Sequence, residues 1–457
     1  MVTKKKPVAI TVSSILTSKQ RFVRNVRWQF VAIGSQVLIG GAYLILLARY
    51  LGPAEFGVFS TVMAVISVVG LLFEMRLQEI VARDFCHLED EKSKLHPHPL
   101  YLVDLFVLEI VSRLLPLMVL LMLSELLVRV IRLEPADSDL ITLAAVGFMV
   151  SKSGSSVSTG LLRVLGRTDL IAYCTSVDSG LRLVISSIFV IIWHLNVDLA
   201  LWIGMSVGVI CNGTQIWLAG REFSLRIAPV SPMGWNVVSA WERLRVARRL
   251  IISNLGLSVS DLMAKDLDVL VISSLLSADK VGIYKMTKNF VQLIWRAIDP
   301  FYIAIMTEIQ RLWQLGEVGD LIYLLRKTSF RLLLLSIALV ALGTTMVSLV
   351  GDKILGDEFR GVADLMLIMS IWIVFCAPLI WGIPLAVAIN RPELSVGGSV
   401  IGLIIGLIGF TILTPSLGLI GAAIALNATL ISGFISTSGF SLWATREKLF
   451  YLRDNNI

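Results

Sequence analysis

Some twelve apolar stretches, each long enough to cross a lipid bilayer, follow one another from Trp28 to Leu442 with short polar connections. A spanning helix needs about 20 mostly apolar residues, so about twelve such helices occupy about 240 residues. That requirement fits a chain of 457 residues in which 56% are hydrophobic. The pattern predicts a protein embedded almost entirely in a membrane, with no water-soluble domain of ordinary size.

The expected spans are helices. Apolar residues occur all round each segment rather than at every second position, and each segment is about twice as long as a barrel strand. This predicts an all-α integral membrane protein and disfavours a β-barrel. The spans run 28–47, 56–74, 100–123, 140–162, 170–193, 199–218, 250–276, 283–306, 332–350, 363–388, 394–413 and 419–442.

The distribution of lysine and arginine predicts the orientation. With the N-terminus in the cytoplasm, the inside segments hold 27 of the 40 cations and the outside loops hold six. Cytoplasmic loops carry such an excess, so we expect both termini in the cytoplasm. The same asymmetry explains the isoelectric point near 9.3. A basic face toward anionic lipid accounts for it, and no nucleic acid partner is expected.

The chain contains an internal repeat. Residues 51–59, LGPAEFGVF, align with residues 276–284, LSADKVGIY, when Gly57 is set on Gly282. Each segment is the outside turn between the first two helices of a six-helix set. Chance similarity of one turn is the alternative, but the matched helix counts favour duplication. Two parallel six-helix lobes around a central cavity are expected, with a substrate path between them.

The expected division of the chain follows from this repeat. Residues 1–27 form a cytoplasmic arm, 28–220 the N-lobe, 221–249 a cytoplasmic linker, 250–443 the C-lobe and 444–457 a cytoplasmic tail.

The first outside turn resembles a known family. Residues 46–57, LLARYLGPAEFG, include Gly52, Pro53 and Gly57. They look like the signature of the polysaccharide transporter family, the O-antigen-type flippases of the multidrug/oligosaccharidyl-lipid/polysaccharide exporter superfamily. Similar segments are 77–83, 161–167, Asp268 and 277–284. One departure is Arg76, where such proteins usually carry glycine.

The resemblance implies a flippase rather than an enzyme. Its substrate would be undecaprenyl-pyrophosphate-linked oligosaccharide, moved by alternating access from the cytoplasmic to the periplasmic leaflet of the bacterial inner membrane. The product would serve O-antigen, capsule or exopolysaccharide synthesis. Its implied partners are membrane lipids, a polysaccharide polymerase and a chain-length regulator. No catalytic residue, metal site or cofactor is expected, although coupling to protons or sodium is allowed.

Two other functional classes compete with this interpretation. A multidrug or cation-coupled exporter of the same superfamily would share the architecture. A membrane polymerase or ligase would carry a large outside loop with catalytic groups, whereas the longest outside loop here, near 124–139, contains no histidine.

Five cations fall near the centres of expected spans, where each costs about 2.5 to 3.5 kcal/mol. A pyrophosphate cannot enter hydrocarbon unpaired, so its path must offer cations sheltered from lipid. We therefore expect these five to bind the pyrophosphate and sugar, and the last two to meet a single pyrophosphate. They are Arg113, Lys152, Arg182, Lys265 and Arg296.

Nearby acids allow a structural alternative, in which ion pairs within helices join the helices together. The pairs three or four residues apart are Glu109 with Arg113, Asp178 with Arg182 and Arg296 with Asp299. Asp261, Lys265 and Asp268 form a stack with the same spacings. Among the five cations, Lys152 alone has no acid within one turn. The candidates for proton or sodium coupling are Asp261, Asp266, Asp268 and Asp299.

Tryptophans near the span ends predict aromatic belts at the two membrane interfaces. These residues are Trp28, Trp193, Trp202, Trp217 and Trp443. Three others lie deeper in their spans and are candidates for stacking on a sugar: Trp295, Trp372 and Trp381.

Overall fold

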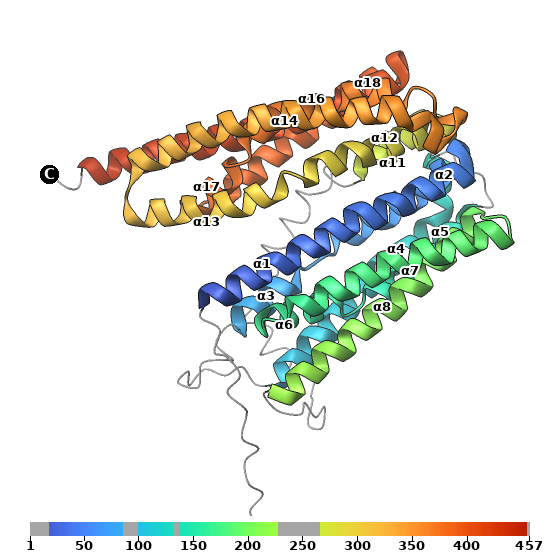
Figure 1. Cartoon of the computed structure of the whole chain (residues 1–457), viewed down its shortest axis with the longest axis horizontal. Helices are drawn as coiled ribbons and strands as arrows, with labels where there is room; N and C mark the ends of the chain where they lie inside the picture. Colours follow the sequence, from blue (N-terminus) through green and yellow to red (C-terminus); the bar gives the residue numbers. More distant parts are fainter. Residues whose placement is uncertain (1–17, 86–98, 132–136, 227–265, 455–457) are drawn as a thin grey trace, which may run out of the picture.

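The computed structural model describes residues 18–85, 99–131, 137–226 and 266–454, and this described part is helical and contains no strand. Its helices form two lobes, the first drawn below the second in Figure 1. The first lobe contains α1 (Ser18–Ser35), the π-helix η1 (Gln36–Gly40), α2 (Gly41–Leu72), α3 (Leu77–Asp84), α4 (Pro99–Ile131), α5 (Asp137–Lys152), α6 (Ser155–Val164), α7 (Thr168–Ile192) and α8 (Val197–Arg226). The second contains α11 (Leu267–Leu275), α12 (Ala278–Arg296), α13 (Asp299–Leu315), α14 (Val318–Leu355), η2 (Asp357–Phe359), α15 (Val362–Met369), α16 (Ile371–Cys376), η3 (Ala377–Leu379), α17 (Gly382–Ala388) and α18 (Glu393–Asp454). The all-α, two-lobe prediction is confirmed.

Eight helical stretches in the described residues are long and apolar enough to cross a membrane. Two of them, Arg27–Leu72 and Glu393–Arg446, contain a sharp turn, at Gly52 (φ +70°) and Gly418 (φ +60°). Each therefore covers two of the expected spans. The expected span 250–276 begins outside the described residues. Helix α8 continues to Arg226, so the predicted N-lobe boundary at residue 220 cuts its last turns.

Three expected spans are interrupted. Span 140–162 breaks between α5 and α6 at Gly154, whose φ of +79° is left-handed. Span 283–306 breaks between α12 and α13, and the second piece continues to Leu315, well past the expected end. Span 363–388 is divided into α15, α16, η3 and α17, with Pro378 in the short η3 turn. Proline removes a backbone donor and cannot continue an α-helix, which explains the last break.

Side chains pair the backbone groups that two of these breaks release. Glu109 Oε1 and Oε2 accept hydrogen bonds from the backbone N–H groups of Ser156 (2.8 Å) and Val157 (3.0 Å) at the start of α6. Asn427 Oδ1 accepts from the backbone N–H of Trp372 (2.7 Å) at the start of α16. Broken helices are tolerated at membrane depth because partners of this kind satisfy the freed groups.

Arg76 occupies a position that favours glycine. It has φ +44° and ψ +48°, the left-handed conformation, directly before α3. A side chain there costs about 1–2 kcal/mol, because Cβ crowds the following carbonyl oxygen. This is the place where the resembling family carries glycine, so the structure supplies the physical reason for that preference.

We expect Arg76→Gly to stabilise the protein by about 1 kcal/mol, since glycine adopts this conformation without steric cost. Thermal unfolding of the purified protein measures the effect. The control is Arg83→Gly inside α3, which should lower the unfolding temperature because glycine weakens helices. An Arg76→Gly variant that melts at or below the wild-type temperature would contradict the prediction.

The two lobes meet at one end of the molecule, which we call the joined end: residues 52–59, 277–284 and 353–359 (Figure 1). A Cβ atom added to Gly57 would lie 1.8 Å from the carbonyl oxygen of Ala278, and one added to Gly282 would lie 2.0 Å from that of Pro53. The contacts are reciprocal and place the two glycines in the same role. The alignment of Gly57 with Gly282 made from the sequence therefore corresponds to a twofold relation at this contact.

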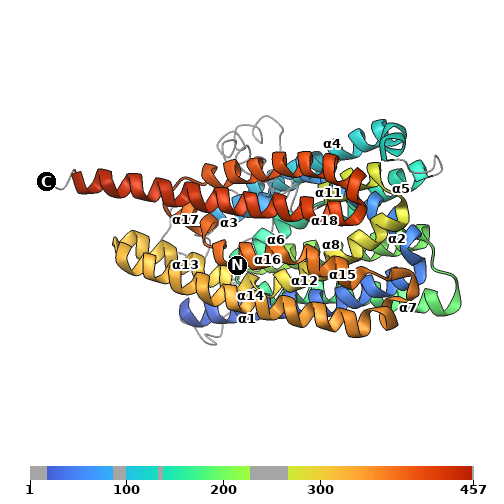
Figure 2. The ribbon, with the colours of Figure 1, turned by 90° about the horizontal axis from the view of Figure 1, so that it is seen from above.

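Two further contacts hold the joined end together. Arg49 Nη1 donates to the carbonyl oxygens of Lys353 (3.2 Å) and Ile354 (3.0 Å), in the last turn of α14. A cation there also interacts favourably with the negative end of the helix dipole. The rings of Phe56 and Phe359 meet edge to face at 6.4 Å. Away from this end the lobes diverge (Figure 1). In the second lobe the long α18 packs against α15, α16 and α17 (Figure 2).

A second repeated element lies at the ends of the helices far from the joined end. Gly166 (φ +65°) and Asn390 (φ +60°) are both left-handed, and each is followed by an arginine. The N–H of Arg167 bonds to Leu162 O at 2.8 Å, and that of Arg391 bonds to Ala386 O at 2.9 Å. The offset between these turns matches that between Gly57 and Gly282 to within one residue. The duplication therefore extends well beyond the single turn seen in the sequence.

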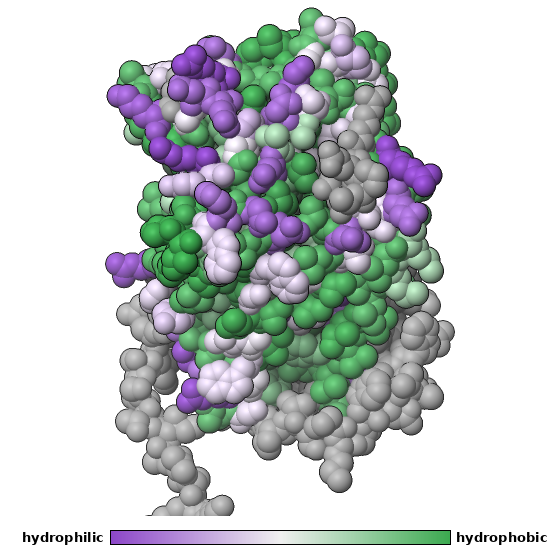
Figure 3. Space-filling model, turned by 90° about the vertical axis from the view of Figure 1, so that its right-hand side faces the viewer, coloured by the Kyte–Doolittle hydropathy of each residue, from purple (hydrophilic) through white to green (hydrophobic). Residues whose placement is uncertain are grey.

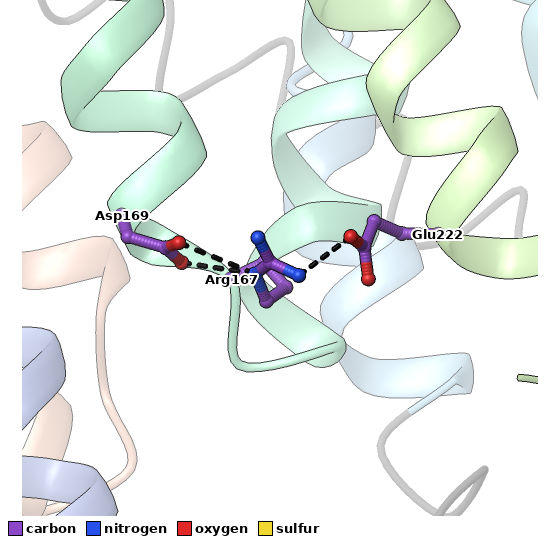
Figure 4. A network of polar contacts seen from close by, with 3 residues as sticks. All are labelled: Arg167, Asp169 and Glu222. Carbon is purple, nitrogen blue, oxygen red and sulfur yellow. Dashed lines mark hydrogen bonds and ion pairs between the residues drawn. The ribbon is translucent and has the colours of Figure 1, made fainter.

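In the first lobe, ion pairs of Arg167 hold the turn between α6 and α7 in place (Figure 4). Arg167 Nε donates to Asp169 Oδ1 (3.1 Å), and its Nη1 donates to Glu222 Oε1 on α8 (2.5 Å). Burial disfavours the charged guanidinium, but the hydrogen bonds and charges of the two acids outweigh it, so the pKa of Arg167 is raised. The network ties the α6–α7 turn to α8.

The surface fits a membrane environment. All five tryptophans expected at the interfaces are exposed. Seen from the joined end, hydrophilic residues gather mainly over the second lobe, in the upper part of Figure 3, and hydrophobic residues cover much of the remaining face. Trp372 and Trp381 are buried. Trp381 Nε1 donates to Ser329 Oγ at 2.9 Å, and Trp372 packs on Trp295 with ring centroids 4.7 Å apart, so both serve the second lobe's core.

Candidate functional site

A cavity of about 350 Å³ lies between the two lobes. Helices α2, α5, α7 and α8 form its first-lobe wall, and Asp266 with α12 forms its second-lobe wall. Ten of the nineteen lining residues are nonpolar, and nine carry polar groups. They are Tyr43, Ser60, Ser67, Ser151, Lys152, Arg182, Asp266, Lys285 and Asn289.

Two of the predicted cations, Lys152 and Arg182, line the first-lobe wall. Lys152 is the last residue of α5, directly before the break at Gly154. Its ammonium has no ion pair or hydrogen bond with any described residue, and it lies 5.8 Å from the centre of the Phe148 ring. The sequence already singled out Lys152 as the cation with no acid within one turn. The structure places it in the cavity without a described partner.

Arg182 keeps the acid expected for it. Its Nε and Nη2 each donate to a carboxylate oxygen of Asp178 at 3.0 Å, so the predicted pair within α7 is confirmed. On α8, Gly204 and Gly208 leave room for the guanidinium. A Cβ atom at Gly204 would lie 3.3 Å from Nη1, and one at Gly208 would lie 3.2 Å from Nη2.

The second-lobe wall is polar but balanced in charge. Lys285 on α12 forms a short ion pair with Asp266, and both line the cavity. One turn further along α12, Asn289 also lines it. The Nδ2 of Asn289 is buried and has no hydrogen-bond partner among the described residues. Such a buried, unpartnered group costs about 1–3 kcal/mol unless a ligand or solvent satisfies it.

Asp268, a predicted ion-coupling residue, is fully buried and does not line the cavity. Its Oδ1 accepts from Lys288 Nζ (2.6 Å) and its Oδ2 from the Tyr284 hydroxyl (2.7 Å). Both partners lie on α12, whereas the sequence suggested a stack with Asp261 and Lys265. Those two residues lie outside the described part of the chain.

The pair of Arg113 with Glu109, which the structural alternative allowed, does not form in the described part of the chain. Glu109 caps α6 instead, because the broken helix presents free N–H groups and the positive end of its dipole. Arg113 is buried, with its Nε unpartnered among the described residues, and it does not line the cavity.

Arg296 and Asp299 also differ from the expectation. Arg296 is exposed at the end of α12 and lies outside the cavity lining. Asp299 begins α13, beyond the break, and no ion pair joins it to Arg296 in the described part. Lys265 lies outside the described residues, so the expected meeting of one pyrophosphate with both Lys265 and Arg296 stays a prediction.

Sequence reasoning missed Lys285, Lys288 and Asn289. Their spacing of three and four residues puts them on one face of α12, which is a readable signal. They were overlooked because they lie near the end of the expected span rather than at its centre.

Comparison with known proteins gives both a family and a fold. Residues 22–306 match the family described as polysaccharide biosynthesis protein. No curated protein matches significantly. Among solved structures, an inward-facing multidrug resistance MATE family transporter of the MOP superfamily shares 15% identity, with a TM-score of 0.71 over 92% of this chain and 96% of that one.

Two other solved structures have the same fold. A MOP superfamily transporter from Pyrococcus furiosus shares 15% identity, with a TM-score of 0.62 over 94% of this chain and 95% of that one. A point mutant of the Vibrio cholerae MATE transporter VcmN shares 14% identity, with a TM-score of 0.60 over 93% of this chain and 97% of that one. The two-lobe fold is therefore that of MOP superfamily transporters.

Proposed function

The chain belongs to the polysaccharide biosynthesis protein family, and from this premise we propose that it is a flippase for lipid-linked oligosaccharide. The substrate would be an undecaprenyl-pyrophosphate-linked unit, moved to the periplasmic leaflet of the bacterial inner membrane for O-antigen, capsule or exopolysaccharide synthesis. Family membership and the fold of MOP superfamily transporters support transport rather than enzymatic chemistry. In this proposal both termini are cytoplasmic and the joined end is periplasmic. A polymerase and a chain-length regulator would act on the product.

The observation that carries the proposal is Lys152, a cation without a described partner in a cavity between two lobes. The Lys152 side chain is exposed in the cavity, so its ammonium is accessible to an anionic ligand. Such a ligand would pair a cation that lies within a membrane-spanning segment. Arg182 lines the same wall and is paired with Asp178, so Lys152 supplies the net positive charge of this wall. A lipid-linked pyrophosphate has the matching charge.

Replacement of Lys152 tests the proposal. We expect Lys152→Met to reduce polysaccharide export at least tenfold while membrane abundance stays normal, because methionine keeps the length and removes the charge. Lys152→Arg should retain part of the export. The matched control is Lys353→Met, since the Lys353 side chain is exposed at the joined end.

Two outcomes would contradict the proposal. Normal export from Lys152→Met would exclude this cavity as the anion path. A deletion strain that exports polysaccharide normally but becomes sensitive to cationic dyes would favour the multidrug exporter instead.

A further inference from the structure

The two walls of the cavity differ in charge. The first-lobe wall has two cations, Lys152 and Arg182, and one carboxylate, Asp178, within hydrogen-bond distance of Arg182. The second-lobe wall has Asp266 and Lys285, which neutralise each other. An anion entering the cavity is therefore attracted to the first-lobe wall, and the second-lobe wall has no excess positive charge among its described residues.

The second-lobe wall offers groups suited to hydroxyl groups. Asn289 has a buried amide nitrogen without a described partner. Asp266 pairs with Lys285 and also interacts with the Ser67 hydroxyl, which lines the cavity as well. An amide supplies donors and an acceptor, and a carboxylate supplies acceptors, which together match the donor and acceptor character of a sugar hydroxyl. A neutral, polyhydroxylated ligand satisfies Asn289 without disturbing the ion pair.

The cavity is too small for a whole oligosaccharide. Its volume of about 350 Å³ is at the lower end of the range for small-molecule pockets, about 300–1,000 Å³. It has room for a pyrophosphate and the sugar directly attached to it. The other sugars of a longer unit must lie outside this cavity.

We infer that each wall binds a different part of the headgroup. Lys152 and Arg182 bind the pyrophosphate, and Asn289, together with the Asp266–Lys285 pair, binds the first sugar. This inference rests on the proposed function and names Asn289 as the specificity-determining residue. Asn289 and Lys285 belong to α12 of the second lobe, whereas both cations belong to the first. A headgroup with its sugar contacts both lobes, and a bare lipid pyrophosphate contacts one.

This division explains how an empty carrier lipid would be rejected. A ligand shifts a conformational equilibrium only by its difference in affinity for the two states. A ligand bound by one lobe has the same affinity for both conformations, because its contacts do not change when the lobes move relative to each other. A ligand held by both lobes is sensitive to that movement, so transport depends on the sugar.

The test uses the purified full-length protein and farnesyl diphosphate, a prenyl pyrophosphate without sugar. We expect Lys152→Met to weaken its binding at least tenfold, and Asn289→Ala to leave its affinity within about twofold of wild type. In cells, Asn289→Ala should reduce polysaccharide export at least tenfold at normal membrane abundance. Asn289→Leu, of similar size, should behave in the same way, so a loss of folding in one variant does not decide the result.

The outcomes separate the two claims. If wild type does not bind farnesyl diphosphate, the pyrophosphate site fails, and the proposed function fails with it. If wild type binds it but both Asn289 variants weaken binding as strongly as Lys152→Met, or export normally, the division between the walls is overturned while the proposed function stands.

Discussion

Replacing Gly57 with valine is expected to force the joined end apart and to abolish export. Any Cβ atom at this position falls 1.8 Å from the carbonyl oxygen of Ala278, far below an ordinary contact of about 3.5 Å. The obstacle is backbone, so no side-chain rotation relieves it. Helices α2 and α12 must separate, so the protein can no longer adopt the conformation in which this end is closed. Gly282→Val should have the same effect through its contact with Pro53.

Distances between spin labels measure this separation. We would place labels at Asp139, exposed at the start of α5 in the first lobe, and at Arg360, exposed directly after η2 in the second lobe, in a protein without its native cysteines. Gly57→Val should shift the distribution to longer distances. Gly213→Val is the matched control, because nothing lies within 4 Å of a Cβ atom added there. An unchanged distribution together with normal export would show that the glycine contact does not close this end.

The Asp268→Ala variant is expected to lose about 3–5 kcal/mol of stability and to be scarce in the membrane. Asp268 is fully buried between Lys288 and Tyr284, so its removal takes away the carboxylate oxygen at 2.6 Å from the Lys288 ammonium and the acceptor of the Tyr284 hydroxyl. The double variant Asp268→Leu with Lys288→Met removes both charges and should recover most of the abundance, since apolar residues of similar size often replace a buried pair at little cost. Thermal unfolding and membrane abundance measure both.

The double variant also separates a structural role from ion coupling. If the double variant is abundant and exports polysaccharide, the role of Asp268 is structural. If it is abundant but inactive, Asp268 retains its place among the candidates for proton or sodium coupling. A double variant as scarce as Asp268→Ala would show that the ion pair is not the source of the instability.

The local signals in the sequence were sufficient for the fold class and for part of the site. In lipid, a long apolar segment can pair all its backbone N–H and C=O groups within itself when it forms a helix. The all-α membrane class therefore follows from composition and length alone. The repeated turn at Gly57 and Gly282 indicated two lobes. The pair of Asp178 with Arg182 was also readable, because residues four apart share one helix face. Lys152 stood out through the lack of any acid nearby.

The remaining charges were decided by tertiary structure. Glu109 has Arg113 one turn away, yet it caps α6, because the break at Gly154 presents N–H groups that no sequence spacing reveals. Asp268 on α11 meets Lys288 on α12, and Asn289 lines the cavity because α12 packs against α2 of the first lobe. Periodicity determines which residues share a face of their own helix. Which face meets another helix depends on how both are packed, and contacts such as those of Gly57 with Ala278 fix that packing.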